Sequence, residues 1–145
     1  MRYLCIDLGD KRTGIAIGDD ITCLTTPVTV LEVPRSHDQG QRLLDAIAQT
    51  IDDQLGPADA LVLGLPLHMD GKESPRSKIV RDFAALLENH TNRVVHLHDE
   101  RLSSVQANWQ MARTGMTRKQ KKHKRDALAA AAILKDFLLT EQKGP

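Results

Sequence analysis

The sequence predicts an α/β fold in which helices cover both faces of a mixed five-stranded sheet. Three strand-like segments, 2–8, 14–18 and 27–33, follow one another through short connections, which predicts an antiparallel meander. Later in the chain, strand-like and helix-like segments alternate, as in sheets built with crossover helices. The run ALVLGLP at 60–66 is apolar throughout, which is typical of a central strand covered on both faces.

The first strands and helices are bounded by residues that favour turns and helix ends. The linker DKRT, between Gly9 and Gly14, predicts a hairpin joining the first two strands. Leucines and isoleucines at helical spacing predict a helix over 39–55, which Gly56-Pro57 ends. Ser74 and Pro75 fit the N-cap and first position of a second helix, which runs through Leu87.

The second half of the chain completes this pattern. We expect a strand at 93–100, a helix at 103–115 and an Ala- and Leu-rich closing helix at 125–142. Residues 118–125 between the two helices are polar and repel one another, so we expect them to be mobile without a partner.

Composition predicts a single domain over 1–145 that resides in the cytoplasm. The chain is 41% hydrophobic and 27% charged, as in soluble globular proteins. No apolar run approaches the roughly 20 residues that cross a bilayer, so no membrane association is expected. Asp7 and Asp10 interrupt any signal-peptide pattern at the N-terminus.

Positive charge is concentrated in one segment. Seven of the 20 Lys and Arg residues fall within 113–125, which contains no acid, while the net charge of the whole chain is only +1. A basic segment on a mildly acidic body is a candidate site for a polyanion such as nucleic acid. Charge alone leaves equally open a solvated loop with no partner.

Three carboxylates fall where surface acids are not expected. Strand alternation puts Asp7 on one face with Tyr3 and Cys5, and puts Glu100 at the end of strand 93–100. Asp126 opens the closing helix, and Asp99 points to the opposite face from Glu100. Because clustered buried carboxylates repel, we expect Mg²⁺ or Mn²⁺ to compensate, as one or two ions, at Asp7, Glu100 and Asp126. Two such ions are a known arrangement for phosphodiester cleavage.

Four motifs in series resemble the YqgF/RuvX family. They are DLGDKRTGIAIGD, GLPLHMDG, DERLSS and KKHKRDALAAAAILKDFL, and they span nearly the whole chain. The resemblance implies a ribonuclease H-like three-layer fold and a metal-dependent nuclease that matures the 5′ end of pre-16S rRNA. It also implies that Asp7, Glu100 and Asp126 are the catalytic metal ligands. A Holliday-junction resolvase role is the alternative within the family.

Candidate contacts to nucleic acid lie near these acids and in the basic segment. Lys11 and Arg12 lie in the first turn, and Arg101 follows Glu100; the candidates in the basic segment are Arg118, Lys119, Lys121, Lys122, Lys124 and Arg125. The expected partners are an rRNA precursor, with branched DNA as the alternative, and ribosomal assembly intermediates. A non-catalytic assembly factor that binds RNA stays open as well. A DLG-type ATP-binding domain is disfavoured, because such proteins need a second lobe.

Overall fold

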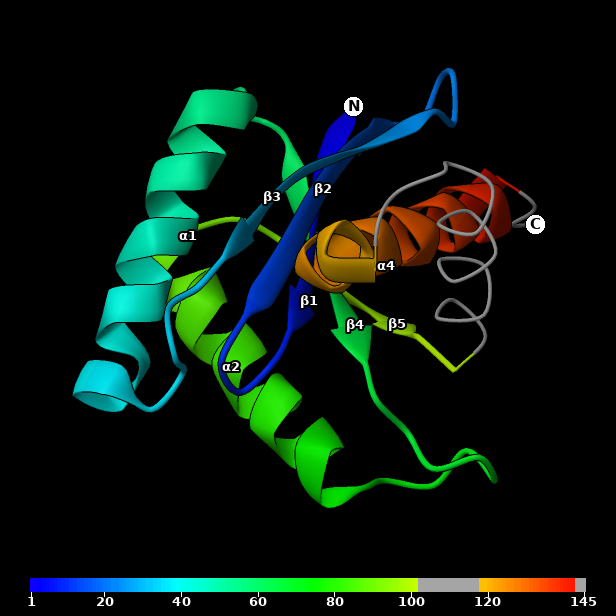
Figure 1. Ribbon diagram of the computed structural model, residues 1–145. Coiled ribbons are helices and arrows are strands. Elements are labelled where there is room, and N and C mark those ends of the chain that lie inside the picture. The colour runs from blue at the N-terminus through cyan, green and yellow to red at the C-terminus, as the bar shows by residue number, and fades with distance from the viewer. Residues whose placement is uncertain (102–117, 143–145) are drawn as a thin grey trace.

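The protein has three layers, with a sheet between two helices on one side and one long helix on the other (Figure 1). The computed structural model describes residues 1–101 and 118–142, apart from the side chains of 118–124 and 141–142. Within the described part of the chain, no helix is long and apolar enough to cross a membrane.

The sheet has five strands in the order β3-β2-β1-β4-β5. β1, β2 and β3 pair antiparallel, whereas β4 pairs parallel with both β1 and β5. The predicted mixed sheet with an N-terminal meander is therefore confirmed. The strands are β1 (Arg2–Leu8), β2 (Thr13–Asp19), β3 (Thr25–Leu31), β4 (Ala60–Leu65) and β5 (Val95–Asp99).

The helices on the first face follow the predicted patterns closely. A 3-10 turn, η1 (His37–Gly40), leads into α1 (Gln41–Gln54), which starts two residues later than expected because Gln39 and Gly40 have positive φ angles. α2 (Pro75–Thr91) begins as predicted, with Ser74 as its N-cap and Pro75 in its first turn.

The closing helix corrects one expectation. α4 (Arg118–Gln142) starts seven residues before the predicted position, so the basic residues expected to be mobile form its first turns. Lys, Arg and Gln are good helix formers, and exposed like charges one turn apart cost only about 0.2–0.5 kcal/mol per pair. The expected helix at 103–115 lies outside the described residues.

Large aliphatic side chains fill the layer between the sheet and the helices α1 and α2. Leu4, Ile6, Leu61 and Leu63 point to this layer from the strands. The layer beneath α4 uses smaller strand residues, namely Cys5, Ala16 and Val62, against Ala130, Ile133, Leu134, Phe137 and Leu138 of the helix. Asp7 alternates with Ile6 along β1, so it belongs to the α4 face.

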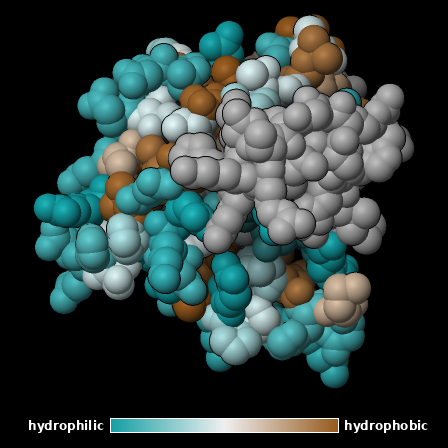
Figure 2. Space-filling model, viewed as in Figure 1, coloured by the Kyte–Doolittle hydropathy of each residue, from teal (hydrophilic) through white to brown (hydrophobic). Residues whose placement is uncertain are grey.

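The face shown in Figure 2 is mainly hydrophilic over α1. A hydrophobic group of side chains lies at its upper right, over the hairpin between β2 and β3, where Ile21 and Leu24 are exposed. The site described next lies elsewhere, at the ends of β1, β4 and β5.

Candidate active site

The first carboxylate, Asp7, lies beside a glycine that lets α4 approach the sheet. Asp7 and Gly14 are register partners in the β1–β2 ladder. A Cβ atom on Gly14 would overlap the backbone of α4 at Asp126 and Ala127. Because Gly14 has no side chain, α4 passes directly over β2 at Asp126 and Ala127, which brings Asp126 towards Asp7.

A second glycine makes room for Glu100. Gly64 of β4 lies on the same face as Val62, next to β1 on the side away from β2. A Cβ atom there would lie 2.6 Å from the Oε2 of Glu100 and 2.9 Å from the Cδ1 of Ile133. Glu100 follows β5 directly, and its side chain reaches across Gly64 towards Asp7 beneath α4.

Asp7 and Glu100 form a hydrogen-bonded carboxyl pair. Burial raises the pKa of Asp7 well above its usual value, and the charges of Glu100 and Asp126 raise it further. Burial also raises the pKa of Glu100, and the hydrogen bond from Asp7 opposes that shift. The raised pKa of Asp7 favours its protonated form, whose O–H donates a hydrogen bond to the Glu100 carboxylate, because two adjacent buried carboxylates do not both ionise easily.

The third carboxylate, Asp126, is held by an arginine. The Nε of Arg12 lies 3.5 Å from its Oδ2, and both side chains remain partly exposed. Burial raises the pKa of Asp126, while the charges of Arg12 and Arg125 oppose the increase. Asp126 contributes repulsion to Asp7, so the three acids predicted from the sequence lie in one neighbourhood.

Asp7 and Glu100 open onto a cavity of about 220 Å³. Its walls come from the loop after β4, from Arg101 and from α4, through Pro66, Leu67, Met69, Arg101, Ala129 and Ile133. The two carboxyl groups are thus reachable by a ligand at the edge of the sheet where β1 and β4 end. Ligand sites of open α/β sheets commonly lie at this edge.

The donor set suits a hard divalent cation, although the acids are not gathered around one point. Carboxylate oxygens are the ligands that Mg²⁺ and Mn²⁺ prefer, and a cation would oppose the burial and the repulsion that raise the pKa of Asp7. Among the described residues, no three His, Cys, Asp or Glu side chains are arranged so that they could hold an ion together. Asp126 instead lies 3.5 Å from the Nε of Arg12.

The predicted nucleic-acid contacts come from three places: the β1–β2 turn, the residue after Glu100 and the start of α4. Lys11 is exposed in the β1–β2 turn and lies close to the acids along the chain. The guanidinium of Arg101 is held by two other residues: its Nε donates to the Oδ2 of Asp99 at 2.7 Å, and its Nη1 donates to the carbonyl of Met69 at 2.9 Å. Arg118, Lys119, Lys121, Lys122 and Lys124 lie in the first turns of α4, and Arg125 is exposed there.

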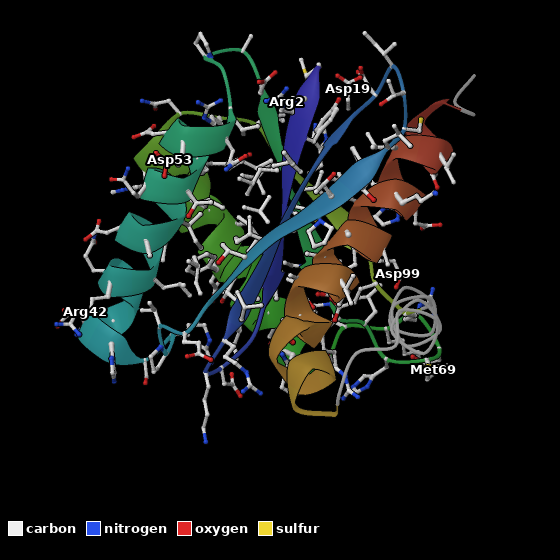
Figure 3. The ribbon with its side chains drawn as sticks, turned by 45° about the horizontal axis from the view of Figure 1, so that its top comes forward. Arg2, Asp19, Arg42, Asp53, Met69 and Asp99 are labelled. Carbon is white, nitrogen blue, oxygen red and sulfur yellow. The ribbon has the colours of Figure 1, made fainter. Side chains whose placement is uncertain are left out.

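Asp99 takes a different position from Glu100. Its hydrogen bonds with the Arg101 side chain lower the pKa of its carboxyl group. It lines a neighbouring cavity of about 350 Å³ with Met69, Arg101 and Asp136. Figure 3 shows Asp99 and Met69 on the side of the molecule near the start of α4.

Sequence reasoning missed three residues that shape this site. The sequence places Gly14 at the end of a hairpin turn and Gly64 inside the apolar run 60–66, but both are needed for the approach of other elements. Arg76 has no distinguishing pattern beyond its place at a helix start, yet its charge acts on both Asp7 and Glu100. The helix-start pattern Ser-Pro-Arg after the β4 loop was the signal that could have revealed it.

Comparison with known proteins assigns the chain to a family. A model of the RuvX family, described as Holliday junction resolvase, matches residues 1–140. The chain belongs to the RuvX family. A "Putative pre-16S rRNA nuclease" of Maridesulfovibrio salexigens is 36% identical to this RuvX protein over 138 residues, which cover 95% of this chain and 98% of that protein. Proteins of the same name from Anaeromyxobacter dehalogenans and a Geobacillus species are 39% and 32% identical, over 95% and 98% of this chain and 96% and 100% of their own.

Solved structures confirm the fold of this RuvX protein. Thermus thermophilus RuvC in complex with a Holliday junction substrate matches with a TM-score of 0.59 at 12% identity, over 99% of this chain and 96% of that chain. The Fowlpox virus resolvase, in complex with Holliday junction DNA, matches with a TM-score of 0.59 at 14% identity, over 99% and 100%. The ribonuclease H-like architecture expected from the sequence is therefore confirmed, and the family implies a hydrolase of phosphodiester bonds.

Proposed function

We propose that this RuvX protein is a Mg²⁺- or Mn²⁺-dependent nuclease that cleaves structured RNA, with the 5′ end of pre-16S rRNA as its target. The observation that carries the proposal is the buried Asp7–Glu100 pair, which opens onto a cavity with Asp126 close by. Burying such a pair costs folding free energy, which a bound cation would offset. The names of the relatives support the choice of RNA.

Asp7, Glu100 and Asp126 are the residues that would hold the metal. Bound cations of this type activate water for in-line attack on a phosphodiester and stabilise the leaving oxygen. The chain's own contribution is to supply carboxylate oxygens from β1, from the residue after β5 and from α4, on a rigid sheet. Arg12 restrains Asp126 in the absence of metal. A bound metal ion would compete with the Arg12 guanidinium for the Asp126 carboxylate.

Basic residues on two elements would hold the substrate backbone. Lys11 is exposed in the β1–β2 turn, and Arg125 is exposed on α4 beside Asp126. The other basic residues of the segment 118–125 extend this charge along the start of α4. Phosphate contacts of this kind make binding fall steeply with salt.

The direct test is cleavage of a pre-16S rRNA fragment by purified protein with and without Mn²⁺. We expect metal-dependent cleavage that Asp7→Asn reduces by at least about 100-fold, since it removes a charged ligand. Asp53→Asn, on α1 at the far side of the molecule, is the matched control and should cleave normally (Figure 3). Equal cleavage by wild type and Asp7→Asn would refute the assigned site.

A second candidate substrate, a four-way DNA junction, is favoured by the family description and by the fold shared with two resolvases. Symmetrical junction resolution needs two active sites, so light scattering should then show a dimer. The same cleavage assay with a four-way junction, an RNA hairpin and a single strand separates the two substrates. Tight, salt-sensitive RNA binding without any metal-dependent cleavage would instead support a non-catalytic assembly factor.

A further inference from the structure

Arg76 occupies a fixed position at the edge of the carboxylate site. It is the second residue of α2, whose N-cap Ser74 accepts a hydrogen bond from the backbone N–H of Ser77 at 3.0 Å. The Ser74 hydroxyl also donates to the carbonyl of Pro66 at 2.5 Å, and Pro66 lines the cavity of Asp7 and Glu100. This hydrogen bond fixes the start of α2, including Arg76, relative to the cavity.

The side chain of Arg76 points back towards β1. Its Nη2 donates to the carbonyl of Leu8 at 3.4 Å, one residue beyond Asp7. Its charge opposes the burial that raises the pKa values of Asp7 and Glu100, and it also lowers the pKa of Asp10. The guanidinium is thus close enough to influence both members of the carboxyl pair.

Arg76 differs from the other arginines around the site in having no carboxylate partner. Arg12 pairs with Asp126, Arg35 with Asp10, and Arg101 with Asp99. In the described part of the chain, no Asp or Glu forms an ion pair with Arg76, and its side chain is exposed. A guanidinium offers five donors in a planar fork, of which the carbonyl of Leu8 uses one. Because the side chain is exposed, an anionic ligand could reach the remaining donors.

The position of Arg76 complements the basic segment of α4. The two helices lie on opposite faces of the sheet (Figure 1). Asp126 of α4 packs on Gly14, the register partner of Asp7. Arg76 of α2 contacts the carbonyl of Leu8, so the two helices approach Asp7 from opposite faces at the edge where β1 ends. A nucleic-acid strand that crosses this edge from α4 to α2 would meet basic residues, then the carboxyl pair, and then Arg76.

We propose that Arg76 is a phosphate-positioning residue, which binds a backbone phosphate next to the one hydrolysed, on the α2 side of the site. This inference rests on the proposed nuclease function. The planar fork of arginine suits two oxygens of one phosphate, and this contact would fix the strand relative to Asp7. It would also offset the repulsion between the carboxylates and the phosphate backbone.

The test compares Arg76→Gln, Arg76→Lys and the control Arg42→Gln. Arg42 lies on α1, away from Asp99 and Met69, and pairs with Asp38 at 3.6 Å, so its loss removes the same charge elsewhere (Figure 3). Binding of a labelled RNA hairpin is measured by fluorescence anisotropy with EDTA present, over a range of salt concentrations. Thermal unfolding checks that each variant is folded.

We expect Arg76→Gln to weaken RNA binding and to reduce the slope of log affinity against log salt by about 0.9 on duplex or 0.7 on single-stranded substrate. Arg76→Lys should keep the slope, because it keeps the charge, but bind more weakly because it lacks the fork. Arg42→Gln should keep the wild-type slope. In cleavage assays with Mn²⁺, Arg76→Gln should raise KM more than it lowers kcat.

The proposal is overturned if Arg76→Gln has the slope and affinity of Arg42→Gln. It is also overturned if Arg76→Gln loses kcat with an unchanged slope, because Arg76 would then act only through the carboxylates. Should Arg76→Gln fail to fold, Arg76→Lys decides: unchanged affinity relative to wild type refutes the role of the fork. Because binding is measured without metal, an inactive wild-type protein would refute the nuclease function while the slopes still decide the role of Arg76.

Discussion

The two faces of the sheet are built from different residues and serve different ends. Towards α1 and α2, the strands present large side chains such as Leu4, Ile6 and Leu63, all fully buried. Towards α4, they present small residues and glycines, including Cys5, Gly14 and Gly64, and the acid Asp7. The first face stabilises the fold by burying apolar surface. The second face gives up apolar side-chain area so that another backbone and two further carboxylates can come close.

The largest effect on stability should come from the aliphatic face. Leu63→Ala removes a fully buried side chain and should lower the free energy of unfolding by about 2–5 kcal/mol. Urea titration measures this loss. Since Leu63 faces away from α4, cleavage by the folded fraction should stay within a few-fold of wild type. A complete loss of activity in protein that is still folded would show that the two faces are not separable in this way.

At Gly14 we expect a smaller loss of stability than at Leu63 but a larger loss of cleavage. Gly14→Ala places a methyl group on the backbone of α4 and should cost about 1–3 kcal/mol. Its loss of cleavage should exceed that of Leu63→Ala at equal folded fraction, because the displaced helix carries Asp126. Gly56→Ala is the control, since among the described residues its Cβ would contact only the Oδ2 of Asp59, at an ordinary 3.4 Å. Normal cleavage by folded Gly14→Ala would contradict the role given to this glycine.

Replacing the buried acid should stabilise the protein while abolishing cleavage. The pKa of Asp7 is raised in the folded state, so at pH values above its unfolded pKa folding must either protonate Asp7 or bury its charge, and both cost stability. Asp7→Asn removes this cost and should raise the unfolding temperature at neutral pH in EDTA. The gain should shrink as the pH falls towards the ordinary range of aspartic acid, where Asp7 is protonated in both states. Unfolding temperatures of the variant and the wild type, measured from pH 4 to 8 with a precision of about one degree, test both the rise at neutral pH and its decrease at low pH.

The smallest effect on stability is expected at the Arg12–Asp126 contact. The pair is partly exposed, so Arg12→Gln should change the free energy of unfolding by less than about 1 kcal/mol. If Arg12 restrains Asp126, the same variant should bind Mn²⁺ more tightly, which calorimetry measures without any substrate. Weaker Mn²⁺ binding by Arg12→Gln would show that the arginine supports the metal site instead.

Local pattern was enough to predict most of the fold. Alternation along β1 predicted that Asp7 shares a face with Tyr3 and Cys5, and Ser74 and Pro75 marked the start of α2. α4 starts earlier than its apolar pattern predicts, because the helix propensity of Lys, Arg and Gln outweighs their charge repulsion.

The parts of the site that escaped prediction depend on contacts between distant segments. Gly14 looks like a turn glycine until its position under Asp126, more than 100 residues later, is known. Arg76 looks like an ordinary helix-start residue, and only its hydrogen bond to Leu8 connects it to the acids. Sequence spacing carries no information on such pairs, since they arise from the way the helices pack on the sheet.

The pairing of Asp7 with Gly14 has a consequence for folding. A hairpin that closed one position out of step would set Thr13 or Ile15 opposite Asp7, and a bulky group would then occupy the path of the closing helix. The helix can therefore dock only on a correctly aligned hairpin. In misaligned chains, the Ala- and Leu-rich surface of that helix would not pack on the sheet. Such chains would be exposed to proteolysis before they could bind nucleic acid.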